Sequence, residues 1–148
     1  LAHGPPGQGK STWALRFAEG MRPACYVSLE EGLGPAVADR LRRLEIRSTD
    51  LRVEEPKTAQ EIVELAGKGY RCMVIDSVTV STLQPEDCLT LARANNLVIV
   101  AVAQETKAGA TAGSSRWSYL ADVVLGFVTL RFTVEKSRFG ALISEPVL

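Results

Sequence analysis

Short aliphatic runs alternate along the chain with amphipathic stretches, and this alternation is typical of βαβ units and a largely parallel sheet. The runs predict strands at residues 24–28, 51–53, 72–75 and 97–103. Apolar residues at helical spacing between them predict helices at 11–19, 37–44, 58–65 and 85–95. The predicted fold class is therefore α/β, with helices flanking a mostly parallel central sheet.

From Val123 onward the pattern changes to strands alone. They cover residues 123–127, 130–134 and 141–147, separated by gaps of turn length, which predicts that the sheet ends in antiparallel strands. The preceding stretch, 105–115, is rich in Gly, Ala, Thr and Ser and lacks periodicity, so we expect a loop that is poorly ordered without ligand. A chain of 148 residues is short for two ordinary domains, and we expect one domain, 1–148.

The most informative motif precedes the first predicted helix and reads Gly-Pro-Pro-Gly-Gln-Gly-Lys-Ser from Gly4 to Ser11. Its glycines allow backbone N–H groups to wrap around phosphate, together with the N-terminus of the helix. Lys10 would neutralise the β and γ phosphates, Ser11 would bind magnesium, and Thr12 would cap the helix or touch the α phosphate. The predicted cofactors are ATP and Mg²⁺, and the predicted binding residues are Gly4, Pro5, Pro6, Gly7, Gln8, Gly9, Lys10, Ser11 and Thr12. Since only residues 1–3 precede the loop, we expect natural residues before Leu1 to be missing or few.

Asp76 ends the apolar strand at residues 72–75. A carboxylate at the carboxyl end of a buried strand lies at the crevice where open α/β sheets bind ligands. Asp76 would hold Mg²⁺ there through water. The alternative is that Asp76 only caps the following turn through Ser77, but its occurrence together with a phosphate loop favours the metal site.

Composition limits the partners and the compartment. Lys plus Arg (17) balances Asp plus Glu (17), so a DNA contact must come from local patches. The three cysteines lack short paired spacing and lie among apolar residues, which favours small hydrophobic residues in a reducing, cytoplasmic protein. No apolar run approaches the roughly 20 residues of a membrane span. His3, the one histidine, has no partner ligands and is interpreted as a packing residue, as are Trp13, Trp117 and Tyr119, which could otherwise stack on adenine or bases.

Several phrases follow one another in the order of the RecA-like core of the bacterial RadA/Sms recombination ATPases. They are Tyr26-Val-Ser-Leu-Glu-Glu31, Arg40-Leu-Arg-Arg-Leu-Glu-Ile46, Val74-Ile-Asp-Ser-Val78, Gln104-Glu-Thr-Lys-Ala-Gly109 and Lys136-Ser-Arg-Phe-Gly140. The last is the most specific, because it is similar to the hallmark Lys-Asn-Arg-Phe-Gly of that family. The chain departs from the family at Ser137, where Asn is usual, and at Gln104, where His is usual.

This resemblance implies a RecA-like P-loop NTPase that hydrolyses ATP as an oligomer, acting on DNA in recombination, repair or replication. It implies that Glu30 activates the attacking water, with Glu31 as the rival; either could instead be a structural acid at a helix start. Gln104, at the end of the strand beside that of Asp76, would sense the γ phosphate. Lys136 and Arg138, expected at the tip of a turn between two terminal strands, would reach the γ phosphate of a neighbouring subunit.

The resemblance also implies single-stranded DNA as a partner of the loop at 105–116. Its two cations, Lys107 and Arg116, would form a basic ring after assembly into a homo-oligomer such as a hexamer. The arginine-rich face of the helix ending at Leu44 is a rival DNA surface, and it can equally be a solvated helix face.

Two other functions stay open. The chain lacks the four-cysteine zinc module that precedes the family's core and the protease-like domain that follows it, so we expect a standalone ATPase core. Without those modules it could be a nucleotide-binding adaptor that does not hydrolyse ATP. A small P-loop phosphotransferase would need an arginine-bearing lid, and the loop at 105–116 offers only Lys107 and Arg116. Turnover of ATP separates these functions.

Overall fold

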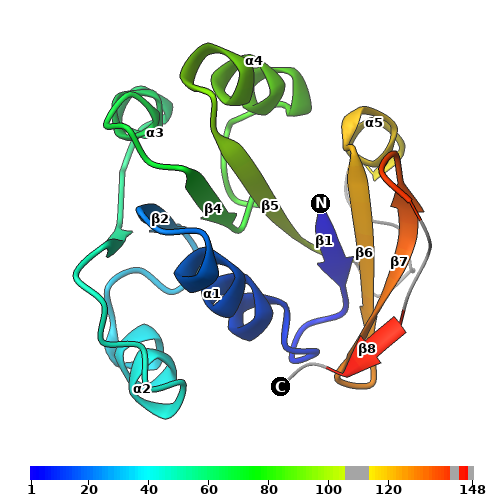
Figure 1. Ribbon diagram of the computed structural model, residues 1–148, viewed down its shortest axis with the longest axis horizontal. Coiled ribbons are helices and arrows are strands. Elements are labelled where there is room, and N and C mark those ends of the chain that lie inside the picture. The colour runs from blue at the N-terminus through cyan, green and yellow to red at the C-terminus, as the bar shows by residue number, and fades with distance from the viewer. Residues whose placement is uncertain (106–113, 141–143, 147–148) are drawn as a thin grey trace.

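The chain folds around one mixed sheet. The structure is a computed structural model that describes residues 1–105, 114–140 and 144–146. Eight strands in these ranges lie in the order β3-β2-β4-β5-β1-β6-β7-β8 (Figure 1). Their bounds are β1 Ala2–Gly4, β2 Ala24–Ser28, β3 Leu51–Glu54, β4 Cys72–Asp76, β5 Val98–Gln104, β6 Val123–Val128, β7 Arg131–Ser137 and β8 Ser144–Pro146.

Strand pairing is parallel from β3 through β6 and antiparallel beyond β6. The predicted mostly parallel sheet with antiparallel C-terminal strands is therefore confirmed. β1 has only three residues, yet it lies between β5 and β6 in the middle of the sheet. All the parallel strands end at one edge, which we name the carboxyl edge, and begin at the opposite, amino edge. The antiparallel β7 therefore ends at the amino edge, where Ser137 pairs with Val123.

Helices cover both faces of the sheet. The described residues form α1 Lys10–Gly20, α2 Pro35–Arg43, α3 Ala59–Ala66, α4 Pro85–Asn95 and α5 Ser114–Leu120. Alternate residues of β2 face opposite layers, as the pleat of a strand requires. Ala24 and Tyr26 pack with α1, whereas Cys25 and Val27 pack with α3 and α4. This double covering explains why the central strands are apolar on both faces.

Local signals account for most helix boundaries. The Thr58 side chain caps α3 by accepting from the Glu61 N–H, as the sequence predicts. The Glu61 carboxylate accepts from the Lys57 N–H, one residue before the N-cap. Helix α5 was not predicted, because its seven residues carry no apolar period of useful length. It is placed by Trp117, which packs against the core cluster beneath α4.

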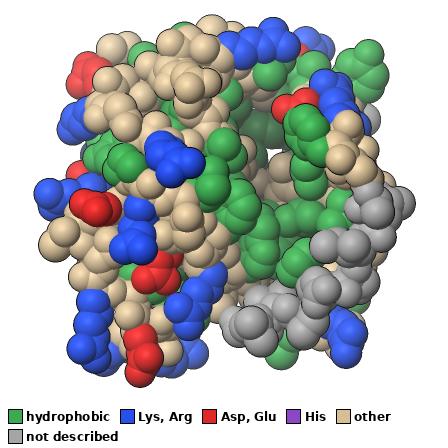
Figure 2. Space-filling view, in the orientation of Figure 1, with side chains coloured by type: hydrophobic (Ala, Val, Ile, Leu, Met, Phe, Trp, Pro, Cys, Tyr) green, Lys and Arg blue, Asp and Glu red, His purple; other side chains and the backbone are tan. Residues whose placement is uncertain are grey.

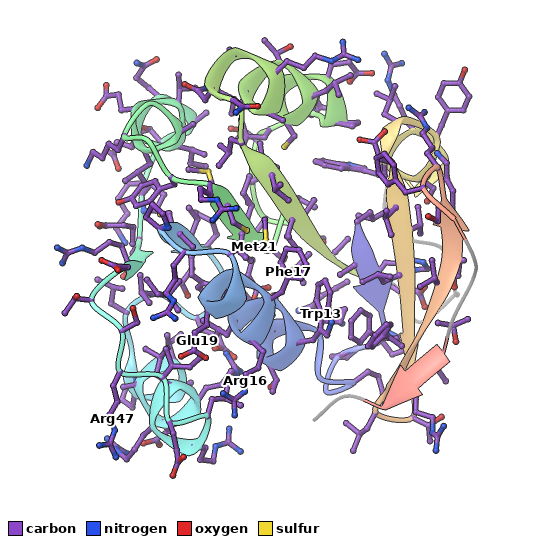
Figure 3. All side chains as sticks on the ribbon, in the orientation of Figure 1. Trp13, Arg16, Phe17, Glu19, Met21 and Arg47 are labelled. Carbon is purple, nitrogen blue, oxygen red and sulfur yellow. The ribbon has the colours of Figure 1, made fainter. Side chains whose placement is uncertain are left out.

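Trp13, Trp117 and the three cysteines behave as packing residues, whereas Tyr119 is 74% exposed and does not pack in the core of this chain as expected. Trp13 on α1 lies 5.7 Å from Phe127 and 6.0 Å from Phe132 between ring centroids, and it points toward the C-terminal strands in Figure 3. Figure 2 shows apolar side chains lining a hollow to the right of α1 and charged side chains to its left. The three cysteines are buried and unpaired, and burial raises the pKa of each to about 12. No helix in the described ranges is long and apolar enough to cross a membrane.

Gly4 marks the closest approach of β1 to its neighbour β6. Its φ of 146° is a conformation that side chains rarely allow, and a Cβ there would collide with the Phe127 carbonyl oxygen. That oxygen belongs to the backbone of β6 and cannot move without disturbing the sheet. Gly126 on β6 is also crowded, but a Cβ there would meet the Glu135 carboxylate, the end of a flexible side chain.

These two glycines predict different costs for the same substitution. Gly4→Ala should destabilise the protein by more than about 2 kcal/mol, because backbone must move and a positive φ must be kept. Gly126→Ala should cost less than about 1 kcal/mol, because Glu135 can turn away. Urea unfolding followed by circular dichroism measures both free energies of unfolding. Equal losses for the two variants would contradict this account of the β1–β6 contact.

Candidate active site

The loop between β1 and α1 leaves the sheet at the carboxyl edge. Gly9 is the N-cap of α1, in the left-handed region with a φ of 86°. No side chain caps this N-terminus, and its first turn contains no acidic residue. Because the first N–H groups of a helix have no partner within the helix, the N-terminus of α1 offers donors and partial positive charge to an anion.

Lys10 lies over this loop and is almost fully buried, with 5% of its surface exposed. Its ammonium group donates to the carbonyl oxygens of Gly4 and Pro5, at 2.7 Å each. Burial lowers the pKa of Lys10, while the nearby charges of Asp76 and Glu30 oppose that effect. The loop therefore holds a buried cation whose charge is incompletely compensated by its surroundings.

Asp76, at the end of β4, is buried with 6% exposure. Its carboxylate accepts a hydrogen bond from the Tyr26 hydroxyl, and the Ser11 side chain lies near that hydroxyl. The Asp76 carbonyl oxygen accepts from the N–H groups of Leu29 and Glu30, at 2.7 and 3.3 Å. The end of β4 thus fixes the backbone that carries Glu30. Sequence reasoning missed Tyr26, because a tyrosine within an apolar strand gives the same signal as a core residue.

Gln104 and Glu30 meet across the carboxyl edge. The Gln104 side-chain amide donates to the Glu30 carboxylate, and the Gln104 backbone N–H donates to the Thr79 hydroxyl at 3.1 Å. The two residues come from the ends of β5 and β2, which are separated in the sheet by β4. A movement of the Glu30 side chain would therefore directly alter the position of the Gln104 side chain at the end of β5.

The neighbouring acid, Glu31, has a different partner. Arg40 on α2 donates two hydrogen bonds to its carboxylate, at 2.6 and 2.9 Å. These bonds lower the pKa of Glu31. The two acids, which the sequence could not distinguish, thus differ in the structure: Glu31 is bound by a cation and Glu30 by a neutral amide.

These groups line a single cavity of about 430 Å³ at the carboxyl edge. Its walls combine the loop and the start of α1 with residues from the ends of β2, β4 and β5. The lining residues are Pro6, Gly7, Gln8, Gly9, Lys10, Ser11, Thr12, Glu30, Glu31, Arg40, Arg43, Asp76, Gln104 and Leu130. Arg40, Arg43 and Leu130 were not predicted there. Leu130, in the turn from β6 to β7, donates its N–H to the Gln8 side chain at 3.2 Å.

His3 makes polar contacts that the packing interpretation did not include. Its Nδ1 lies 2.6 Å from Oε1 of Glu105, just after β5, and its Nε2 lies 2.7 Å from Oε2 of Glu135 on β7. The Glu135 side chain reaches His3 across Gly126, which has no side chain in that space. The sequence held no signal for this bridge, since its three residues are far apart in the chain.

Lys136 and Arg138 lie at the amino edge, away from the cavity lining. The expectation that both project from the tip of a turn is wrong for Lys136, which lies within β7. Its ammonium group donates to the carbonyl oxygens of Ser118, Tyr119 and Ala121, at 2.7–2.8 Å. Carbonyls at a helix C-terminus lack partners within the helix, so they attract a cation. Arg138 follows β7 and pairs with Asp122 at 3.0 Å, with both side chains 53% exposed.

Most of the predicted DNA loop, residues 106–113 with Lys107, lies outside the described residues. Arg116 belongs to α5 and pairs with Glu86 on α4. Arg116 is 70% exposed, so this pair contributes little to stability. The described part of the chain therefore leaves the predicted DNA contact untested.

Comparison with known proteins gives one group of relatives. The chain is 32% identical over 165 aligned residues to the DNA repair protein RadA of Mycobacterium tuberculosis, which covers 96% of this chain and 32% of the relative. It is 30% identical over 166 aligned residues to the DNA repair protein RadA of Aquifex aeolicus, covering 95% of this chain and 37% of the relative. The chain thus spans about a third of the length of these curated relatives. It matches no protein-family model.

The contacts of Lys136 predict a structural effect that is separate from catalysis. Lys136→Met keeps the aliphatic chain but removes the donor to the carbonyl groups of Ser118 and Tyr119 in α5 and of Ala121 just after it, so it should destabilise the protein by about 1–2 kcal/mol. Hydrogen exchange should become faster in α5 first. The exposed Lys68→Met serves as the control, and similar exchange rates in α5 for both variants would exclude the capping role.

Proposed function

We propose that the chain is the RecA-like ATPase core of a RadA-type protein, which hydrolyses ATP as a cytoplasmic oligomer and acts on DNA in recombination, repair or replication. One observation carries the proposal: a single cavity combines a phosphate-type loop with a buried lysine, Lys10, and the carboxylates of Glu30 and Asp76. The similarity to two RadA proteins supports the same assignment. The parallel sheet with antiparallel C-terminal strands is what a RecA-like core requires.

The residues present fit a nucleoside triphosphate with magnesium. The uncapped N-terminus of α1 and the buried charge of Lys10 favour the binding of an anion at the loop. The Ser77 hydroxyl, next to Asp76, is the one buried side-chain polar atom without a partner in the described residues. Ser11 and Asp76 would bind Mg²⁺, which keeps several waters and needs few protein ligands. When bound, Mg²⁺ neutralises charge on the phosphate oxygens.

Glu30 is proposed as the general base. A carboxylate one water away from the γ phosphate can orient that water and accept its proton. Glu31 lines the same cavity, but its two hydrogen bonds to Arg40 stabilise its charged form and occupy both of its oxygens. Gln104, bound to Glu30, would report the γ phosphate to the segment after β5. The chain's own residues thus divide binding, proton transfer and sensing among three strand ends.

Exchanging each acid for its amide tests whether Glu30, and not Glu31, is the general base. Glu30→Gln should retain ATP binding and lose hydrolysis by roughly 100-fold or more, because a general base is neutralised without a change of shape. Glu31→Gln is the matched control and should retain most activity while weakening its contact with Arg40. ATP turnover and binding of a fluorescent ATP analogue measure the two effects. If Glu31→Gln shows the larger loss, the assignment of the base is wrong. Wild-type protein that binds ATP without turnover would favour the adaptor function.

Lys136 and Arg138 are proposed to act on the nucleotide of a neighbouring subunit. Both lie at the amino edge, so they cannot serve the cavity of their own chain at the carboxyl edge. Packing the amino edge of one chain toward the carboxyl edge of the next would bring Arg138 to a γ phosphate, where it would stabilise developing charge. Lys136 would join it by releasing the carbonyls that it binds in its own chain. Such a head-to-tail homo-oligomer forms a ring, for example a hexamer, when the rotation between chains closes, and a helical filament when it does not.

Mixing two inactive variants tests this shared site. Arg138→Ala should bind ATP normally and hydrolyse it poorly, and it should regain activity when mixed with Glu30→Gln. Some interfaces in the mixture combine an intact base with an intact Arg138, and only those are complete. Turnover and light scattering report activity and assembly together. Absence of rescue despite co-assembly, or full activity of a wild-type monomer, would exclude the shared site.

Single-stranded DNA is the proposed partner of the segment 105–116. The relatives are DNA repair proteins by name. The segment carries Lys107 and Arg116 in a chain without net charge, so several copies would be needed to produce a strong local field. The proposed DNA contact therefore depends on the proposed assembly.

A further inference from the structure

We propose that Tyr26 is a positioning residue of the magnesium site, whose hydroxyl orients the carboxylate of Asp76 and keeps it beside Ser11. The inference rests on the proposed function, because it concerns how this chain would hold Mg²⁺ with a nucleotide. Tyr26 would not touch the metal. It would act through Asp76.

The position of Tyr26 makes this contact possible. Tyr26 lies in β2, pairs with Val74 of β4 and is 1% exposed. Val74 and Asp76 are two residues apart on one strand and therefore point to the same face of the sheet. The ring of Tyr26 packs in the apolar cluster with α1. Its hydroxyl extends from that cluster to Oδ2 of Asp76.

The hydroxyl lies beside both residues that would hold the metal. It donates to Asp76, and the Ser11 side chain is near it. Ser11 comes from the start of α1 and Asp76 from the end of β4, so no backbone pairing links them. Tyr26 therefore lies where the loop side of the site meets the strand side.

A phenol suits this task better than a cation would. The cations nearby have other partners: Lys10 binds loop carbonyls and Arg40 binds Glu31. A neutral donor satisfies a buried carboxylate and leaves its negative charge for the metal. The hydrogen bond occupies Oδ2, which leaves Oδ1 for a water of the metal. Outer partners of this kind commonly set metal affinity by holding a ligand in orientation.

Tyr26→Phe is the direct test, because it removes the hydroxyl and keeps the ring. A fluorescent ADP analogue is bound to the protein while Mg²⁺ is titrated, and Mn²⁺ binding is followed separately by electron paramagnetic resonance. The magnesium concentration at half saturation should rise about 10-fold or more. Nucleotide affinity in excess EDTA should change less than about 2-fold, since the loop is untouched. Tyr70→Phe, which removes a phenol packed against the other face, should change neither value.

A double-mutant cycle separates positioning from a general structural effect. Asp76→Asn alone should raise the magnesium requirement, and adding Tyr26→Phe to it should change that requirement less than about 2-fold, because the hydroxyl acts through the carboxylate. Additive effects, or an unchanged magnesium requirement in Tyr26→Phe, would overturn the inference. Wild-type protein that binds no nucleotide at any magnesium concentration would overturn the proposed function itself, which is a distinguishable result.

A second measurement applies if Tyr26→Phe does not fold. The chain has three tyrosines, so Tyr70→Phe combined with Tyr119→Phe leaves Tyr26 as the only phenol. Infrared difference spectra of this variant, with ring-labelled tyrosine, should show a shift of the Tyr26 C–O band when Mg²⁺ is added to the nucleotide complex. An unshifted band would overturn the inference.

Discussion

Lys10, the first residue of α1, has only 5% of its surface exposed, and the architecture of the carboxyl edge depends on accommodating its ammonium group. Burial of a cation is costly unless charge and hydrogen bonds compensate it. Two loop carbonyls supply the hydrogen bonds, while Asp76 and Glu30 supply opposite charge nearby. The same carboxylates need donors of their own, which Tyr26 and Gln104 provide. Accommodating one buried charge therefore accounts for polar side chains at the ends of β2, β4 and β5 in an otherwise apolar sheet.

The amino-acid pattern was sufficient for the parts of this structure that rest on short-range rules. Alternating apolar runs predicted the parallel strands, and the loop from Gly4 to Ser11 predicted which helix begins at the site. Asp76 could be found because it ends an apolar strand. Tyr26 could not, because its hydroxyl gains a role only when β2 and β4 lie side by side. Lys136 was misplaced because β7 continues to Ser137, beyond the apolar pattern at residues 130–134. Its partners lie in and just after α5, a helix without a periodic signal.

The two edges of the sheet carry different chemistry. The carboxyl edge contains the loop, the acids and Gln104. The amino edge carries Lys136 of β7, which binds carbonyls at the end of α5, and Arg138 beside Asp122. Between them, His3 on β1 connects Glu105 at the end of β5 with Glu135 on β7. This bridge spans the central strands on one face of the sheet. It gives β7 a polar link to the strand that precedes the phosphate-type loop.

The placement of β1 also constrains the order in which the molecule can form. Ala2 pairs with Val102 and Leu125. β1 therefore cannot enter the sheet until residues about a hundred positions later have been synthesised. Such distant contacts form slowly, because a long loop must close before they stabilise anything. During synthesis, β2, β3 and β4 can associate while β1 is still unpaired. The loop after β1 is thus fixed only when both neighbouring strands have left the ribosome, and a nascent chain lacks the cavity at the carboxyl edge until its sheet is nearly complete.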